Sequence, residues 1–125
     1  MIKNDLVVLA VDDDMINLKL LKSMLKKGGN VKEVIEAKNG SDAIGVLKSR
    51  DDIDLILLDI IMPIMGGIDM LKVVRADDNL RQLPIIVLTT DETKKAEALE
   101  CGANGFLMKP IRNEELLKKI ATVIL

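Results

Sequence analysis

The stretch Leu6-Val-Val-Leu-Ala-Val11-Asp-Asp-Asp14 places three carboxylic acids directly after six apolar residues. Two further apolar runs, Ile53 to Leu58 and Ile85 to Leu88, are equally short and rich in branched side chains. Strands that are buried on both faces of a parallel sheet have such sequences, because neither face alternates with solvent. These runs predict the centre of a parallel β-sheet, and Val31 to Ala37 and Gly105 to Met108 predict two more strands.

Amphipathic helical patterns separate the predicted strands. Apolar residues recur at helical spacing in residues 17–27, 41–50, 67–75 and 113–125, and more weakly in residues 91–101. Gly28-Gly29 predicts the end of the first helix, and Asn113 predicts the N-cap of the last. Alternating strands and helices form parallel sheets with right-handed crossovers. We therefore predict an α/β fold, a five-stranded doubly wound sheet of order 2-1-3-4-5 with five helices, as one domain over residues 1–125.

The composition excludes several classes of function. The chain of 125 residues is 49% hydrophobic and 30% charged with a net charge of −2, so it lacks the basic excess of a nucleic-acid-binding domain. It has no histidine and one cysteine, Cys101, which excludes imidazole-based triads and an intramolecular disulfide. No apolar run reaches the length of a signal-peptide core or a membrane span. We expect a cytoplasmic protein that binds neither nucleic acid nor membrane directly.

Polar residues follow four of the five predicted strands. Asp12 to Asp14 follow the first strand, Asp59 the third, Thr89 the fourth and Lys109 the fifth. Ligands of open parallel sheets bind beyond the carboxyl ends of the strands. Because the order 2-1-3 makes the first and third strands neighbours, we expect Asp12, Asp13 and Asp59 to converge.

Such a cluster requires either protonation of some of the carboxylates or a hard cation among them. Two unit charges 4 Å apart repel each other by roughly 4 kcal/mol at an effective dielectric constant of about 20. Oxygen-only ligands favour Mg²⁺ as the cation. A cation, a carboxylate, the Thr89 hydroxyl and the Lys109 ammonium are together what a phosphoryl group requires.

Four motifs make the sequence resemble the receiver domain of two-component response regulators, the fold of the bacterial chemotaxis regulator. They are Val11-Asp-Asp-Asp14, Leu58-Asp59-Ile-Ile-Met-Pro-Ile-Met-Gly-Gly67, Pro84-Ile-Ile-Val-Leu-Thr-Thr90 and Gly105-Phe-Leu-Met-Lys-Pro110. The resemblance covers the whole chain and implies a flavodoxin-like phosphoacceptor in a phosphorelay, not an enzyme with an external substrate. It implies Mg²⁺ as cofactor and a sensor histidine kinase or histidine phosphotransfer protein as donor. It also implies that the face of the fourth helix, fifth strand and fifth helix contacts an output domain or receptor.

The resemblance assigns roles to individual residues of this sequence. Asp59 is implied as the phosphoacceptor, and Thr89 and Lys109 as ligands of the phosphoryl oxygens. The implied Mg²⁺ ligands are Asp13, Asp59 and the backbone carbonyl of Ile61, with Asp12 acting largely through water. Phe106 is implied as an aromatic switch that moves with Thr89, and the Lys109-Pro110 bond is expected to be cis. Thr90 and Gly66 depart from the family, which usually has Ala and Asp there.

The sequence leaves structural roles and other functions open for these residues. Asp12 to Asp14 are also suited to cap a helix, Thr89-Thr-Asp-Glu92 matches a capping box, and Phe106 is also a core residue by its size. One alternative function is a phosphatase with an aspartyl-phosphate intermediate, although Asp59-Ile-Ile61 lacks the second Asp of an Asp-x-Asp motif. The other alternative is a phosphate-independent interaction scaffold.

Overall fold

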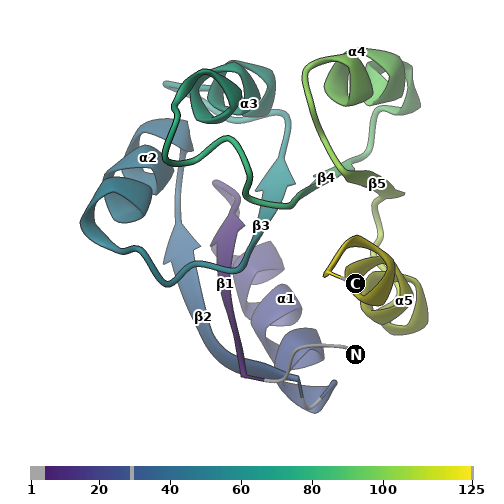
Figure 1. Cartoon of the computed structure of the whole chain (residues 1–125). Coiled ribbons are helices and arrows are strands. Elements are labelled where there is room, and N and C mark those ends of the chain that lie inside the picture. Colours follow the sequence, from purple (N-terminus) through teal and green to yellow (C-terminus); the bar gives the residue numbers. More distant parts are fainter. Residues whose placement is uncertain (1–4, 29, 125) are drawn as a thin grey trace.

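The five strands form one parallel sheet in the order β2-β1-β3-β4-β5 (Figure 1). This computed structural model describes residues 5–28 and 30–124. The strands are β1 (Leu6–Val11), β2 (Val31–Ala37), β3 (Leu55–Asp59), β4 (Ile85–Thr89) and β5 (Gly105–Met108). The predicted strand order is confirmed, and β3 begins two residues later than the apolar run that predicted it.

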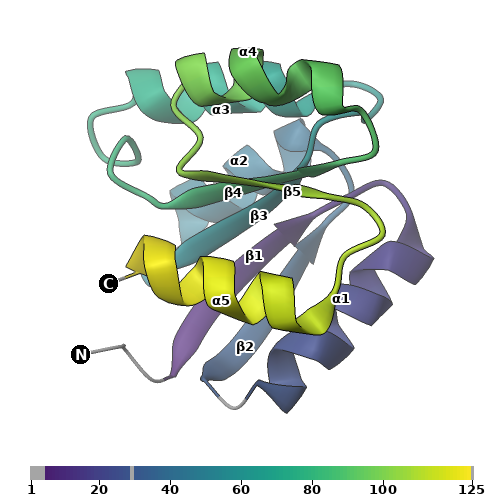
Figure 2. The same ribbon diagram turned by 90° about the vertical axis from the view of Figure 1, so that its right-hand side faces the viewer.

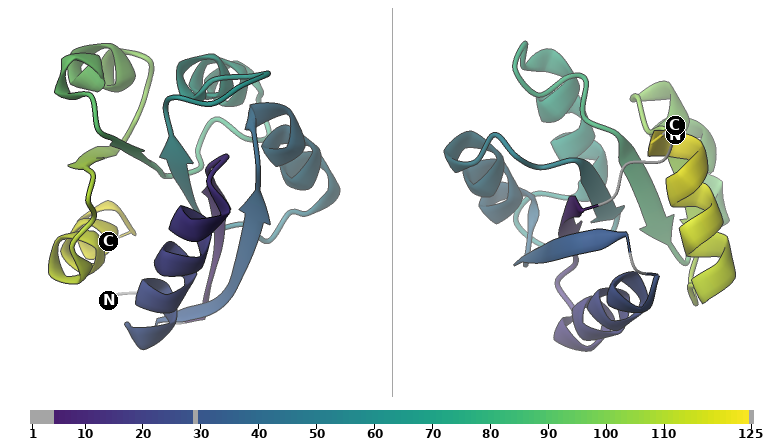
Figure 3. Two further views of the ribbon diagram at one scale, coloured as in Figure 1. Left: turned by 180° about the vertical axis from the view of Figure 1, so that it is seen from behind. Right: turned by 60° about the horizontal axis from the view of Figure 1, so that its bottom comes forward.

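Helices cover both faces of the sheet. They are α1 (Met15–Lys27), α2 (Gly40–Ser49), α3 (Gly67–Ala76), the 3₁₀ turn η1 (Glu92–Lys94), α4 (Lys95–Glu100) and α5 (Asn113–Ile124). Figure 2 and the left view of Figure 3 show α1 and α5 on one face and α2, α3 and α4 on the other. Within the described ranges, none of these helices has the length and apolar character needed to cross a membrane.

The sheet separates two hydrophobic clusters. Along β1, Val7, Leu9 and Val11 face the cluster beneath α2, α3 and α4, and the alternate residues face the cluster beneath α1 and α5. Every residue of β1 is at most 5% exposed. Complete burial explains why this strand is a continuous apolar run, since each large side chain contributes about 1.5–3 kcal/mol when it leaves water.

Side-chain caps decide where several helices begin. The Asp14 carboxylate accepts a hydrogen bond from the Ile16 amide at 2.9 Å, so α1 begins two residues earlier than predicted. The Asn39 side chain accepts one from the Asp42 amide at 2.8 Å and caps α2. The prediction of Asn113 as an N-cap is wrong, because Asn113 is already the first residue of α5.

The segment after β4 differs most from the prediction. The capping box on Thr89 does not form; the Asp91 carboxylate instead accepts a hydrogen bond from the Thr93 amide at 3.0 Å. A short 3₁₀ turn follows, and α4 has six residues, of which Ala98 is buried. The predicted helix over residues 91–101 is therefore a turn followed by a short helix.

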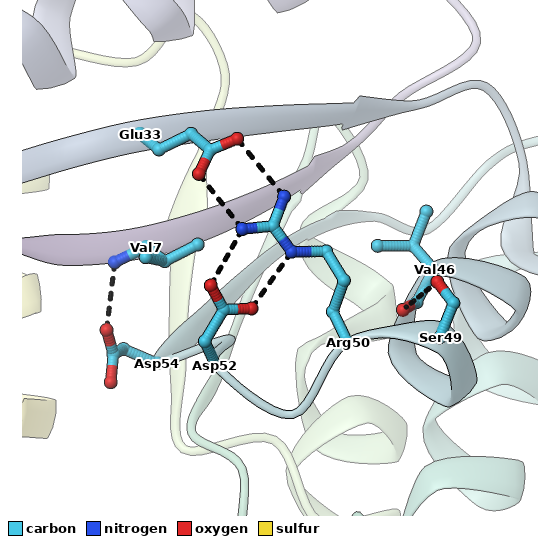
Figure 4. Close-up of polar contacts among 7 residues, drawn as sticks. All are labelled: Val7, Glu33, Val46, Ser49, Arg50, Asp52 and Asp54. Atoms are coloured by element: carbon cyan, nitrogen blue, oxygen red, sulfur yellow. Dashed lines mark hydrogen bonds and ion pairs between the residues drawn. The ribbon is translucent and has the colours of Figure 1, made fainter.

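An ion-pair cluster supports the amino ends of the strands (Figure 4). The Arg50 guanidinium lies 2.9 Å from Glu33 of β2 and 2.7 Å from Asp52 in the α2–β3 loop. Hydrogen bonds from Arg50 lower the pKa of both carboxyl groups. In the same loop, the Asp54 carboxylate accepts a hydrogen bond from the Val7 amide at 2.9 Å. These contacts connect the edge strand β2 and the central strand β1 to the loop that leads into β3.

Candidate functional site

The carboxyl ends of β1 and β3 bring three aspartates together. Asp12 and Asp13 follow β1, and Asp59 is the last residue of the adjacent strand β3. One carboxylate oxygen from each residue lies within 4.8 Å of the other two. Asp12 and Asp59 are buried, whereas Asp13 is exposed. The predicted convergence of these residues is confirmed.

Lys109 places a positive charge against the two buried aspartates. Its Nζ lies 2.8 Å from Asp12 Oδ2 and 3.4 Å from Asp59 Oδ1. The Lys109 amide donates a hydrogen bond to the Thr89 carbonyl at 2.8 Å, which positions the residue directly after β5. The Lys109-Pro110 bond is cis, as expected. An ammonium group thus bridges the ends of β1 and β3 from the far side of β4.

Burial and the neighbouring charges shift the proton affinities of these groups. Burial raises the pKa of Asp59 to about 6; the charge of Lys109 opposes this rise, and the charges of Asp12 and Asp13 add to it. Burial alone would lower the pKa of Lys109, but its hydrogen bond to Asp12 and the two aspartate charges outweigh burial and raise it. The lysine therefore stays protonated at neutral pH, and the Asp59 carboxylate is held in an environment that disfavours its charge.

The backbone fixes the orientation of the Asp12 carboxylate. The Asp12 amide donates to the Ala37 carbonyl at 3.0 Å and continues the pairing of β1 with β2. Asp12 Oδ1 accepts a hydrogen bond from the Asp14 amide at 2.9 Å, an Asx turn that leads into α1. The expected roles of Asp12 did not include this contact, although an Asp two residues before a helix cap is a signal for such a turn.

Asp59 lies against the start of α3 with no room between them. A Cβ atom at Gly67 would lie 2.5 Å from the Asp59 carbonyl oxygen. The Gly67 amide donates to the Ile60 carbonyl at 2.8 Å and closes the β3–α3 loop. Gly66 is the N-cap of α3 and provides no side-chain hydrogen bond, as its departure from the family pattern predicts.

The remaining predicted site residues, Thr89, Ile61 and Phe106, differ in burial. Thr89 is fully buried at the end of β4, and its Oγ1 accepts a hydrogen bond from the Asp91 amide at 3.1 Å. Ile61, two residues beyond Asp59, has a 59% exposed side chain. Phe106 pairs with Val87 and packs against the α2–α3–α4 side of the core. Its ring centroid lies 5.9 Å from Lys95 Nζ.

The donor set fits a hard divalent cation. Its protein ligand atoms are carboxylate oxygens, which Mg²⁺ and Ca²⁺ prefer, and no sulfur or imidazole donor occurs among the three residues of the cluster. The exposed Asp13 opens the cluster to solvent, as a metal that keeps several water ligands requires. The arrangement can hold a small cation beside a carboxylate, with an ammonium group on the other side.

Comparisons with known proteins agree with this geometry. The family model of the response regulator receiver domain matches residues 8–121. Chemotaxis protein CheY1 of Helicobacter pylori (strain J99 / ATCC 700824) is 36% identical over 120 residues, which cover 94% of this chain and 95% of that protein.

Two solved structures extend the comparison. The chemotaxis response regulator CheY4 of Vibrio cholerae is 35% identical with a TM-score of 0.85, over 94% of this chain and 98% of that chain. The receiver domain of sensor histidine kinase PA1611 from Pseudomonas aeruginosa PAO1, solved with a magnesium ion coordinated in its active-site cleft, is 28% identical with a TM-score of 0.85. That match covers 95% of this chain and 97% of the other. The sheet order, the acidic cluster and the family match over residues 8–121 lead to one conclusion: the chain belongs to the response regulator receiver domain family.

Proposed function

We propose that this chain is the phosphoacceptor of a two-component phosphorelay and that Asp59 receives the phosphoryl group. The observation that carries the proposal is the convergence of Asp12, Asp13 and Asp59, with the Lys109 ammonium 3.4 Å from Asp59. A buried carboxylate beside an acidic pair and a cation is poorly suited to a purely structural role, because burial disfavours its charge. The same arrangement is suited to accept a group that brings its own compensating contacts.

The proposed reaction is a direct phosphoryl transfer. An Asp59 carboxylate oxygen attacks phosphorus while the bond from phosphorus to the donor nitrogen breaks, and the bonding electrons return to the imidazole ring of the donor histidine. The product is an acyl phosphate on Asp59. The donor histidine of a phosphorelay must lie outside these 125 residues, because they contain no histidine. A sensor histidine kinase and a histidine phosphotransfer protein both provide this chemistry.

The residues around Asp59 have distinct tasks in this proposal. Asp12, Asp13, Asp59 and the Ile61 carbonyl would hold Mg²⁺, which neutralises the charge of the phosphoryl oxygens. Lys109 lies within ion-pair distance of Asp59 and would bind a phosphoryl oxygen from the opposite side. Thr89 would donate a hydrogen bond from its hydroxyl group to another phosphoryl oxygen.

Phosphorylation would act on a distant surface through the end of β4. Thr89 Oγ1 accepts a hydrogen bond from the Asp91 amide, and Asp91 caps the turn that leads into α4. If the Thr89 hydroxyl turns toward a phosphoryl oxygen, this link to the turn before α4 changes. Phe106 in the neighbouring strand β5 would then repack, so that the face of α4, β5 and α5 presents a different surface to an output domain or receptor.

Incubation with acetyl phosphate and Mg²⁺, followed by intact mass spectrometry, tests the proposal. We expect one added phosphoryl group on the unaltered chain and none on Asp59→Asn or in the presence of a chelator. Asp69→Asn is a matched control, because Asp69 is an exposed aspartate on α3. Labelling that persists in Asp59→Asn would refute the assignment of Asp59, and a complete lack of labelling would favour the scaffold alternative.

A further inference from the structure

Ile64 in the β3–α3 loop combines two unfavourable properties. Its φ angle is 69°, and the Met65 amide donates to the Pro63 carbonyl at 2.8 Å, which makes Ile64 the central residue of a tight γ-turn. A β-branched residue is rarely found at positive φ, because its side chain crowds the backbone there. The Ile64 side chain is also 83% exposed, the highest value among the exposed large hydrophobic residues of the described chain. Neither the backbone nor the core explains an isoleucine at this position.

The loop holds Ile64 close to the acidic cluster. Gly67 lies against the Asp59 backbone, and three Cα–Cα steps of about 3.8 Å each separate Gly67 from Ile64. Ile64 therefore lies within about 11 Å of the residue that contacts Asp59. A standard protein interface buries about 800 Å² on each partner, which corresponds to a radius of about 16 Å. A standard-sized interface centred on Asp59 is therefore wide enough to reach this part of the surface.

Exposed apolar side chains concentrate around the same edge of the sheet. The structure has eight exposed large hydrophobic residues in its described part, and five of them lie in the β3–α3 loop or on α1. Ile61 and Ile64 are in the loop; Met15 and Ile16 begin α1, directly after the three aspartates. Apolar residues on two sides of an acidic pocket form an interface pattern, in which burial of the apolar rim provides affinity around a polar centre.

We infer that Ile64 is a specificity-determining contact for the protein phosphodonor, whose apolar side chains cover it when the phosphohistidine reaches Asp59. This inference rests on the proposed function. The donor is the occupant that fits the position, because in the proposed phosphorelay the phosphoryl group arrives at the centre of this patch on a histidine that these 125 residues lack. In this inference Ile64 contacts the donor protein and does not touch the reacting atoms.

Parallel labelling with a small donor and a protein donor tests this inference. The variant is Ile64→Asn, because asparagine tolerates positive φ and removes the apolar surface without disturbing the turn. We expect its melting temperature to equal or exceed that of the unaltered chain and its labelling by acetyl phosphate to be unchanged. The protein donor is the fastest in a panel of purified histidine kinases phosphorylated with ATP. We expect transfer from it to fall at least tenfold in kcat/KM, through an increase in KM.

The controls separate this inference from the function on which it rests. Val73→Ala removes a 38% exposed apolar side chain from α3 and should leave transfer from both donors unchanged. A lack of labelling of the unaltered chain by acetyl phosphate would refute the phosphoacceptor proposal itself. Equal transfer rates for Ile64→Asn and the unaltered chain with the protein donor would overturn the inference alone. So would a decrease in self-association of Ile64→Asn in sedimentation experiments with no change in transfer, because the patch would then contact a second copy of the chain.

Discussion

At the residue scale, the Asp59 carboxyl group destabilises the folded state at neutral pH in the absence of Mg²⁺. Burial raises its pKa to about 6, so ionisation at neutral pH is less favourable in the folded chain than in the unfolded one. We predict that Asp59→Asn increases the free energy of unfolding at pH 7.5 in a chelating buffer by on the order of 2 kcal/mol. Urea denaturation of both proteins measures this difference, and a less stable variant would contradict the prediction.

Because of this raised pKa, the stability difference between the unaltered chain and Asp59→Asn depends on pH. The folded-state pKa lies above the unfolded value, so the contribution of Asp59 is fully present below about pH 4 and is lost as pH rises through about 6. The unaltered chain should therefore lose stability over this range relative to Asp59→Asn. We predict a small difference between the two proteins near pH 4.5 and a larger one at pH 7.5, measured by urea denaturation in chelator. A constant difference across this range would show that Asp59 titrates normally.

The sequence predicts some residues of the site and not others for a physical reason. These site residues lie at or directly after the carboxyl ends of strands, namely Asp12 and Asp13 after β1, Asp59 at the end of β3 and Lys109 after β5. Parallel strands end at one edge of the sheet, so the approach of these residues depends only on strand order. The conformation of Ile64 depends instead on how the loop closes between Ile60 and Gly67. Because isoleucine disfavours positive φ, the sequence gives no sign that Ile64 adopts a positive φ angle.

At the element scale, the segment after β4 shows how local competition limits prediction. Thr89, Thr90 and Asp91 are all residue types that cap helices, and the pattern alone favoured Thr89. The fold buries Thr89 at the sheet edge and leaves Asp91 to make the cap. Since Ala98 is the buried residue of α4, packing does little to extend that helix. Strand positions were predictable because burial fixes them, whereas helix ends depend on which of several caps forms.

Arg75 connects three elements at the end of the sheet opposite the acidic cluster. Its guanidinium donates to the carbonyls of Gly102, Leu83 and Arg81 and to the side chain of Asn104, at 2.8–3.1 Å. Burial lowers its pKa, and each of these four acceptors is an uncharged oxygen. This geometry suits the planar fork of arginine and cannot be reproduced by the single ammonium group of lysine.

We predict that Arg75→Lys lowers the free energy of unfolding by about 2 kcal/mol, because the part-buried carbonyls of Leu83 and Gly102 lose their donors. Arg81→Lys is the control, since the Arg81 side chain is exposed and its ion pair with Asp78 is long at 3.9 Å. That variant should lose less than about 0.5 kcal/mol. Chemical denaturation measures both values, and equal losses would mean that Arg75 is not an anchor.

At the scale of the whole molecule, the sequence predicts the architecture because the architecture follows from burial. Central strands covered on both faces must be apolar throughout, and short connections between alternating strands and helices leave few sheet orders. The order β2-β1-β3 then places the ends of β1 and β3 together. The position of the acidic cluster is thus a consequence of the fold, and its repulsion is a property of the folded state alone.

A cation that binds only the folded cluster must therefore stabilise the whole molecule. We predict that Mg²⁺ raises the free energy of unfolding with its concentration, by about 2.7 kcal/mol at 100 times its Kd. Asp13→Ala removes a proposed ligand that is exposed, and should abolish the increase. Asp14→Ala is the matched control: it removes the cap of α1 and lowers the baseline by about 1 kcal/mol, yet should keep the increase. Urea titrations at several Mg²⁺ concentrations measure both. If the free energy of unfolding of Asp13→Ala still increases with Mg²⁺, the cation binds elsewhere. Exposed carboxylates outside the cluster would then account for the binding.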